Sequence, residues 1–428
     1  MVTRTRNTGR TPGINPGLTL LFALVGGVGV GNLYWAQPLL GDIAAEQGVL
    51  PGTSGLLVTL SQVGYALGVF LVVPLGDTLN RKRLIPIIML LCSLSLGGCV
   101  LAPNFTVLLT TLALVGFTNV AGQLLLPLAG DLATDEQRGR VVGTIASGFL
   151  IGILLSRMVS GIVADIFGWR MIYVAASGMM LVLAAIMSRA IPVLAPRNRI
   201  PYGRLLRSVG EAVVRYRSVR IIAVLGAALM CVFMAFWTGL TFLLGADPFS
   251  FTASQIGLVS LFGVAGVLGA QITGRVYDRG WSVPAIGIGL AITLVSIAVS
   301  GLGGSSIVAV LVAVSLLSVG VQSVLVLLQT MMVSIDSAAR SRLNTALIVG
   351  NFIGGAIGST LAAILWQVGG WATVMSGSSL VVAFALTIWF IHKRRALSEF
   401  TKTSSMSPAA NDVSLQHERR DLGDTRAT

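Results

Sequence analysis

The chain has 428 residues, of which 54% are hydrophobic and only 11% are charged, with a net charge of +13. A soluble domain carries about 25% charged residues, so this chain has too few to cover a water-facing surface of its size. The composition therefore excludes an ordinary soluble protein and predicts an integral membrane protein.

The runs between charged residues give the expected spans. A spanning helix needs about 20 apolar residues. In chain order the runs are 11–41, 47–76, 84–130, 141–164 (broken once by Arg157), 171–188, 221–246, 248–274, 280–335 and 343–392. Three of them are long enough for two helices each, and turn residues such as Gly369-Gly370 divide them. The sequence therefore predicts an all-α membrane protein with twelve transmembrane helices. Membrane strands are not expected, because the runs lack the short alternating pattern of barrels.

The positive charge lies on one side of these helices. If the N-terminus is cytoplasmic, all but two of the 29 Lys and Arg residues fall on inner segments, the exceptions being Arg157 and Arg170. This asymmetry follows the positive-inside rule. It predicts a multi-pass protein of the cell (inner) membrane with both termini cytoplasmic. The basic charge then contacts anionic lipid, and a nucleic-acid partner is not expected.

The longest inner connection joins two groups of six helices. Leu205, Val209 and Val213 recur at helical spacing opposite a series of arginines, which predicts an amphipathic helix at the inner membrane surface. The expected divisions are a cytoplasmic tail (1–16), an N-terminal six-helix bundle (17–193), the basic linker (194–220), a C-terminal six-helix bundle (221–395) and a disordered cytoplasmic tail (396–428).

The two halves share an internal repeat with an offset of 202 residues. Four residues of the first half recur at the same spacing in the second: Arg138, Gly148, Gly152 and Trp169 correspond to Arg340, Gly350, Gly354 and Trp371. Two six-helix units that both begin inside are parallel repeats with pseudo-symmetry about the membrane normal. This arrangement is associated with alternating access to a central site.

Residues 73–82 (VPLGDTLNRK) carry a family resemblance. The segment is similar to the loop signature of the major facilitator superfamily, G-x-L-x-D-R-x-G-R-R. Asp77, Arg81 and Lys82 match it, whereas Val73 and Asn80 replace two glycines. A second copy at 274–280 (GRVYDRG) includes Asp278 and Arg279.

Helix 5 carries a second resemblance, to the antiporter signature G-x8-G-x3-G-P-x2-G-G of the drug:proton branch. Its slots hold Gly143, Gly152, Ser156, Arg157, Ser160 and Gly161. Small residues fill every glycine slot, but arginine replaces proline. Together with residues 32–40 (NLYWAQPLL) and 168–170 (GWR), this resembles the bacterial sugar, arabinose and purine-nucleoside efflux permeases. We expect the stripe of Gly148, Gly152, Ser156 and Ser160 to pack against helix 8 across the two halves.

The resemblance implies a secondary active transporter that exports a small organic solute, such as a sugar, a nucleoside or a drug-like molecule, in exchange for protons. Asp77 is expected near the start of helix 11, at about Leu343, where a carboxylate is favoured. There it forms a latch with Arg81, Lys82 and Arg140 that closes the inner side, and Asp278 and Arg279 form its second-half counterpart.

Arg157 is the charged residue well inside a helix, which makes a functional role the default expectation. Polar and aromatic residues at mid-helix are the other candidates for a central cavity: Asn32, Tyr34, Trp35, Gln37, Gln62, Tyr65, Asn119, Gln123, Trp237, Gln322 and Asn351. Such a cavity suits a neutral polyhydroxylated or amphiphilic solute, with or without an anionic group.

Proton coupling has no obvious carrier, since the acids fall in loops, tails or helix ends. If protons are coupled, Asp42, Asp131 or Asp165 must titrate; the alternative for each is a capping or solvated role. The chain has no phosphate-binding G-x-x-x-x-G-K loop and no metal-ligand spacing, so we expect no enzyme activity, cofactor or metal. A facilitator or importer of the same fold, or a solute receptor that does not transport, are the alternatives. A monomer suffices for this architecture.

Overall fold

The computed structural model describes residues 13–192, 201–336 and 339–393. Eleven helical segments in these ranges are long and apolar enough to cross a membrane. The last of them, Arg340–His392, is broken at Gly369 and at Gly370, where φ is +63°. It therefore contains two spans, and the described chain has the twelve transmembrane helices predicted from the sequence.

The N-terminal half contains six spans. Its elements are α1 (Pro16–Asn32), η1 (Gln37–Leu39), α2 (Leu40–Gln47), α3 (Pro51–Leu71), α4 (Leu75–Thr78), α5 (Arg81–Val100), α6 (Phe105–Thr118), α7 (Ala121–Leu132), α8 (Asp135–Phe167) and α9 (Arg170–Ala190). The first span comprises α1, η1 and α2, and the fourth comprises α6 and α7. Asparagine side chains begin three of the spans: Asn15 accepts a hydrogen bond from the Gly17 amide, Asn80 from the Lys82 amide and Asn104 from the Val107 amide. These caps satisfy amide groups that the helix itself leaves free.

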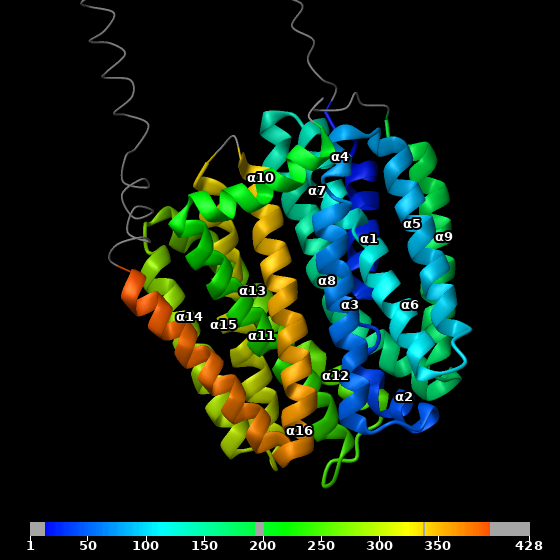
Figure 1. Cartoon of the computed structure of the whole chain (residues 1–428), viewed down its shortest axis with the longest axis vertical. Coiled ribbons are helices and arrows are strands. Elements are labelled where there is room, and N and C mark those ends of the chain that lie inside the picture. Colours follow the sequence, from blue (N-terminus) through cyan, green and yellow to red (C-terminus); the bar gives the residue numbers. More distant parts are fainter. Residues whose placement is uncertain (1–12, 193–200, 337–338, 394–428) are drawn as a thin grey trace, which may run out of the picture.

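The C-terminal half repeats this plan. Its elements are α11 (Arg217–Gly245), α12 (Ala253–Val259), η2 (Ser260–Gly263), α13 (Val264–Asp278), α14 (Ser282–Leu302), α15 (Ile307–Ser334) and α16 (Arg340–His392). The two halves stand side by side, blue to green and green to orange in Figure 1.

The helix α10 (Tyr202–Arg215) lies in the linker between the halves (Figure 1). Leu205, Val209 and Ala212 form its buried face, while Arg207 and Glu211 pair on the exposed face at 2.9 Å. The Tyr202 hydroxyl donates to the Leu71 carbonyl of α3. The amphipathic pattern of the linker thus corresponds to a helix that packs mainly against α16 and α11 of the C-terminal half, with Tyr202 reaching α3. The tail predicted at 396–428 lies outside the described residues.

Equivalent glycines bring equivalent helices together in the two halves. A Cβ atom on Gly152 of α8 would lie 2.1 Å from the carbonyl oxygen of Gly27 on α1, and one on Gly354 of α16 would lie 2.1 Å from that of Ala227 on α11. Both helix pairs therefore need glycine for their closest approach. Close contact of this kind is how helices gain packing energy in a membrane, where neighbouring lipid is as apolar as the helix.

The bundle has two distinct ends. We call the end that carries Arg81, Lys82 and Arg83 of α5 and Arg340 of α16 the basic end; α4 and α10 lie there (Figure 1). The other, which we call the opposite end, carries α2 and the start of α12 (Figure 1). Between the two ends, many large apolar side chains face outward, including Leu94 and Val182, which are 64% and 56% exposed. These side chains form a surface suited to lipid.

Candidate functional site

Arg81 is the centre of a charged cluster at the basic end. It is the first residue of α5, and the Asn80 cap fixes the start of that helix. Its guanidinium bonds to the Asp77 carboxylate at 3.0 Å, to the Asp131 carboxylate at 2.9 Å and to the Gly76 carbonyl at 2.7 Å. Because all four residues belong to the N-terminal half, the cluster is complete without the other half.

A cavity of about 300 Å³ separates this cluster from the C-terminal half. Asp77, Arg81 and Gln123 line one side, and Arg340 and Asn344 of the first turns of α16 line the other. Helix 11 thus begins three residues before the expected Leu343. The carboxylate of Asp77 shares a cavity with the N-terminus of this helix, and the space between them is open.

The other residues predicted for the latch are more dispersed. Arg140 is exposed on α8, so Arg81 rather than Arg140 pairs with Asp77. Lys82 is half-buried beside the cluster, and Arg279 is exposed after the end of α13. The side chain of Asp278 lies outside the described residues. The pairing of Asp131 with Arg81 was not predicted, because an acid near a helix end has the sequence pattern of an ordinary cap.

The halves meet closely at the opposite end. A Cβ on Gly161 of α8 would lie 2.2 Å from the carbonyl oxygen of Ala253 on α12, and one on Gly257 would lie 2.4 Å from that of Arg157. The Asp165 carboxylate accepts a hydrogen bond of 3.1 Å from the backbone amide of Ser254, in the first turn of α12. A carboxylate is favoured at a helix N-terminus. Asp165 thus joins the two halves, although its sequence pattern does not distinguish it from other acids near helix ends.

The stripe of small residues on α8 has a different partner from the one predicted. Gly148 and Gly152 pack against Ala23 and Gly27 of α1, within the same half. The contact with helix 8 is made by other residues of α8: the Ser260 hydroxyl donates to the Leu154 carbonyl, and Gly257 packs against Arg157. Gly143 has open space beside it. The hydroxyl groups of Ser156 and Ser160 bond to α8 carbonyl groups, at Ile153 and Arg157.

Arg157 lies buried between the halves, with 2% of its surface exposed. Its Nε atom donates to Oε1 of Gln37 at 2.6 Å. Its guanidinium carbon lies 4.8 Å from the centre of the Tyr34 ring, 5.9 Å from that of Phe233 and 4.1 Å from that of Trp237. Tyr34 and Gln37 belong to the first span, whereas Phe233 and Trp237 belong to α11. Both halves therefore contribute to the cage around this cation.

Besides Gln37, two further glutamines, Gln62 and Gln322, lie near this cage. Gln37 and Gln62 each donate to the sulfur of Met234 on α11, at 3.4 and 3.8 Å. Gln322 of α15 lines a small cavity of about 20 Å³ together with Arg157. Tyr34, Gln37, Trp237 and Gln322 thus surround or adjoin Arg157, and Gln62 is joined to this group through Met234.

Three predicted cavity residues instead bond to one another inside the N-terminal half. Asn32 donates to Asn119 at 3.3 Å and accepts from the Trp35 indole at 2.8 Å. Asn119 in turn donates to the Gly29 carbonyl of α1, at the break between α6 and α7. The roles seen for these amides are helix–helix contacts.

Of the remaining predicted residues, Tyr65 and Gln123 lie elsewhere between the halves, whereas Asn351 lies against α11 within the C-terminal half. Gln123 donates to the Tyr65 hydroxyl at 3.0 Å, and the Tyr65 ring lies 4.2 Å from that of Phe352 on α16. Gln123 lines the cavity at the basic end. Asn351 faces Gly226 of α11, and its Oδ1 atom is buried without a hydrogen-bond partner.

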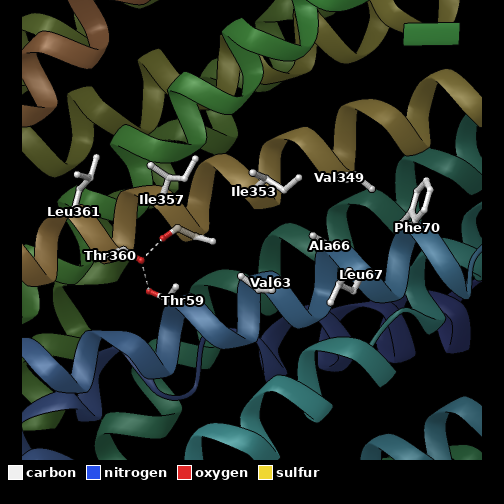
Figure 2. A pocket seen from close by; sticks show the side chains of 11 residues that line it. Thr59, Val63, Ala66, Leu67, Phe70, Val349, Ile353, Ile357, Thr360 and Leu361 are labelled. Atoms are coloured by element: carbon white, nitrogen blue, oxygen red, sulfur yellow. Dashed lines mark hydrogen bonds between the residues drawn. The ribbon is translucent and has the colours of Figure 1, made fainter. Parts of the chain in front are cut away.

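A lateral groove follows the contact between α3 and α16. Toward the opposite end the two helices are joined by Thr59, whose hydroxyl lies 2.8 Å from that of Ser359 and 3.1 Å from that of Thr360. From there toward the basic end they enclose an apolar groove of about 730 Å³, lined on α3 as far as Phe70 and on α16 as far as Val349 (Figure 2). The halves are therefore tied together at the opposite end and less closely packed toward the basic end.

Comparison with known proteins identifies the family. The profile of the Major Facilitator Superfamily matches residues 20–336. An uncharacterised transporter of Escherichia coli O157:H7, YgaY, is 36% identical over 388 residues, which are 90% of this chain and 98% of that protein. A "Probable sugar efflux transporter" of Helicobacter pylori is 26% identical over 248 residues, 56% of this chain and 61% of that protein.

A solved structure shares the fold. The crystal structure of a bacterial homologue of the human lysosomal transporter Spinster, inward-facing and unoccupied, has a TM-score of 0.71. It is 15% identical in sequence and covers 92% of this chain and 100% of that one. The chain belongs to the Major Facilitator Superfamily. It is a multi-pass membrane transport protein of a bacterial transporter family, and not an enzyme.

Proposed function

We propose that the protein is a secondary active transporter that exports a small organic solute across the bacterial inner membrane in exchange for protons. The observation that carries the proposal is the asymmetry of the two ends. The halves are joined at Asp165 and Ser254 but separated by a cavity at Asp77 and Arg340. A site between them, at Arg157, can therefore be reached from one side at a time, which is the requirement for alternating access.

The basic end is assigned to the cytoplasm. Arg81, Lys82, Arg83, Arg138 and Arg340 all lie there, and positive residues are retained on the cytoplasmic side during insertion. With this orientation the cavity between Asp77 and Arg340 lies at the cytoplasmic end, and the end joined by Asp165 and Ser254 lies on the outer side. Both chain termini follow on the cytoplasmic side, and the exposed basic residues of α10 face anionic lipid headgroups.

At each end, a carboxylate of the N-terminal half is positioned to bind a helix N-terminus of the C-terminal half. At the opposite end, Asp165 of the N-terminal half binds the N-terminus of α12 in the C-terminal half. At the basic end, Asp77 of the N-terminal half faces the N-terminus of α16 across the cavity. If the halves rock about the Arg157 region, the Asp165 contact breaks as the Asp77 carboxylate reaches α16. The stabilisation of a carboxylate at a helix N-terminus is about 0.3–1 kcal/mol when exposed, which is small enough to break in each cycle.

Protons are proposed to act on these carboxylates. Among the described residues, the acids lie in loops or near helix ends, so none is available beside Arg157. Protonation of Asp77 or Asp165 removes the charge that favours the helix N-terminus and so releases that end. Export is the preferred direction because the sequence resembles efflux permeases and because one relative is named as a sugar efflux transporter.

Everted membrane vesicles test the proposal. Respiration acidifies the vesicle lumen, and an exporter then accumulates solute inside. Sugars, nucleosides, organic anions and cationic drugs should be screened with vesicles from cells that make the wild type, the Asp77→Asn variant or no transporter. Accumulation that depends on the wild-type protein and collapses with an uncoupler supports a proton-driven exporter. Accumulation that ignores the uncoupler refutes coupling, and counterflow without accumulation identifies a facilitator.

A further inference from the structure

Two buried hydrogen-bond donors in the Arg157 cage have no acceptor. They are Nη2 of Arg157 and Nε1 of Trp237. The guanidinium carbon lies 4.1 Å from the centre of the Trp237 ring, so both donors belong to one small region between α8 and α11. A buried donor without a partner is costly and calls for an explanation such as a missing ligand. Two adjacent donors match an acceptor-only group, and a carboxylate is such a group.

The charge of the cage also favours an anionic ligand. Arg157 keeps its charge in proteins, and its described side-chain contacts are the neutral oxygen of Gln37 and three aromatic rings. The ion pairs of the described chain that involve Arg81 and Arg170 lie toward the two ends of the bundle and do not reach this depth. A charged group at membrane depth is expensive unless an opposite charge accompanies it. One cation is neutralised by one negative charge, which favours a monoanion over a phosphate ester or a dicarboxylate.

The walls of the cage indicate the rest of the ligand. Tyr34, Phe233 and Trp237 present rings, and Ile153 and Leu154 of α8 line the adjoining small cavity. Besides Arg157 and Trp237 Nε1, Ser318 and Gln322 supply the polar side-chain groups of that cavity, and the rest of its lining is apolar. Flat or aromatic bodies fit between aromatic rings by stacking or edge contacts.

The site is narrow in the described arrangement. The cavity beside Arg157 has a volume of about 20 Å³, and a water molecule needs roughly 10–15 Å³. Its lining comes from α8 of one half and from α11, α13 and α15 of the other. A relative motion of the halves therefore widens it directly, so solute binding and rocking are coupled.

We propose that the transported solute is an organic monoanion with an aromatic or similarly flat apolar body, whose carboxylate accepts hydrogen bonds from Arg157 Nη2 and Trp237 Nε1. This inference rests on the proposed transport function and narrows its substrate class. Among the solutes left open by the sequence it favours the anionic ones, because a neutral solute leaves the buried guanidinium without a counter-charge.

Binding to the purified full-length protein in lipid nanodiscs tests the inference. The probes are benzoate and 1-naphthoate, each compared with its neutral amide, and acetate as a carboxylate without an aromatic body. Affinity is measured by isothermal titration calorimetry. We expect each aromatic carboxylate to bind at least about tenfold more tightly than its amide, since hydrogen bonds to charged groups are the stronger ones. Acetate should bind more weakly than benzoate.

Substitutions of Arg157 and Trp237 test whether the preference for a carboxylate depends on these two side chains. Arg157→Gln should abolish the preference for carboxylate over amide, and Arg157→Lys should retain part of it. Trp237→Phe keeps a ring but removes one donor, so it should weaken 1-naphthoate binding about three- to tenfold. Arg170→Gln is the matched control, because Arg170 also stacks on a tryptophan, Trp169, at 4.3 Å but lies at the opposite end. It should leave the preference unchanged.

The outcomes distinguish this inference from the proposed function. If amides bind as well as carboxylates, or if folded Arg157→Lys and Arg157→Gln keep the full preference, the anion site is refuted. The vesicle assay can still show proton-driven transport of a neutral solute in that case, and the proposed function then stands. Carboxylates that bind through Arg157 but are never accumulated would support the site and refute the exporter.

Discussion

Asp165 and Ser254 join the two halves of the protein at the end where they are closed. The carboxylate at the end of α8 accepts a hydrogen bond from the Ser254 amide in the first turn of α12, at 3.1 Å. At the other end of the bundle, Asp77 lines a cavity whose far wall is the start of α16. One carboxylate thus holds a helix N-terminus of the opposite half, and a second faces such a terminus without holding it.

Removing the charge of Asp165 should open its end. Asp165→Asn loses about 0.3–1 kcal/mol of interaction with the α12 terminus, which is a roughly two- to fivefold shift toward separated halves. Ala363 is buried against Gly52 and Gly55 of α3, so Ala363→Cys reports this opening. In a background without the three native cysteines, its labelling by an impermeant maleimide should accelerate about two- to fivefold.

Asp247→Asn is the control for this experiment. Asp247 accepts from the Ser250 hydroxyl within its own loop and lies near the same end. Its substitution should leave the labelling rate unchanged. An unaltered rate in Asp165→Asn would show that the carboxylate does not hold the halves together.

The two carboxylates on Arg81 should differ in transport but not in stability. Asp77 and Asp131 are similarly exposed, at 20% and 25% of their side chains, so each Asn variant should lower the free energy of unfolding by about 1 kcal/mol. Asp77 also lies opposite the α16 terminus, and Asp77→Asn should therefore reduce vesicle accumulation about two- to fivefold. Asp131→Asn should retain most of it. Equal transport losses in the two variants would assign Asp77 a purely structural role.

The threonine contact between α3 and α16 should contribute to closing the same end as Asp165. Thr59→Val removes hydroxyl contacts with Ser359 and Thr360, and such interhelical bonds average about 0.6 kcal/mol in membranes. Labelling at Ala363→Cys should rise about two- to threefold. Thr118→Val should not change it, because the Thr118 hydroxyl donates to carbonyl groups of its own helix, inside the N-terminal half. A response of equal size in both variants would rule out a specific contribution from this contact.

The repeat predicts matched destabilisation in the two halves. Gly152→Ala and Gly354→Ala each place a methyl group 2.1 Å from a backbone carbonyl oxygen of a neighbouring helix. Overpacking of this kind costs about 1–3 kcal/mol, so both variants should unfold at lower temperature by similar amounts. Gly143→Ala has open space and should be neutral. Thermal unfolding in detergent, followed by tryptophan fluorescence, measures the effect. A stable Gly354→Ala beside an unstable Gly152→Ala would contradict the equivalence.

The sequence predicted the spans, and predicted that Arg157 lies inside a helix, for related reasons. Long charge-free runs and one isolated charge can both be recognised from the order of residues along the chain. A charged residue at membrane depth is energetically costly, so such a residue stands out. The repeat at Gly152 and Gly354 likewise marked equivalent positions. Contact partners were harder to predict. A glycine indicates that some helix comes close, but not which one, and Gly152 faces α1 rather than helix 8.

Only some of the residues at the site could be predicted from the sequence. Phe233 lies in a continuous apolar run, so nothing in the sequence separates a ring facing Arg157 from one in the core. Asp131 and Asp165 have the pattern of ordinary acids near helix ends, and their partners, Arg81 and Ser254, come from distant segments. Such pairings depend on how the helices pack, and a single sequence carries no direct signal for them.

The central claim is that the two ends open alternately. Spin labels at Arg83→Cys and Ser341→Cys report the basic end, and labels at Ala45→Cys and Val368→Cys report the opposite end; all four positions are exposed. Pulsed electron–electron double resonance in nanodiscs measures each distance at acidic and neutral pH, with and without 1-naphthoate. The account predicts that one distance shortens whenever the other lengthens. Distances that stay fixed, or that change in the same direction, in a preparation that transports solute would contradict it.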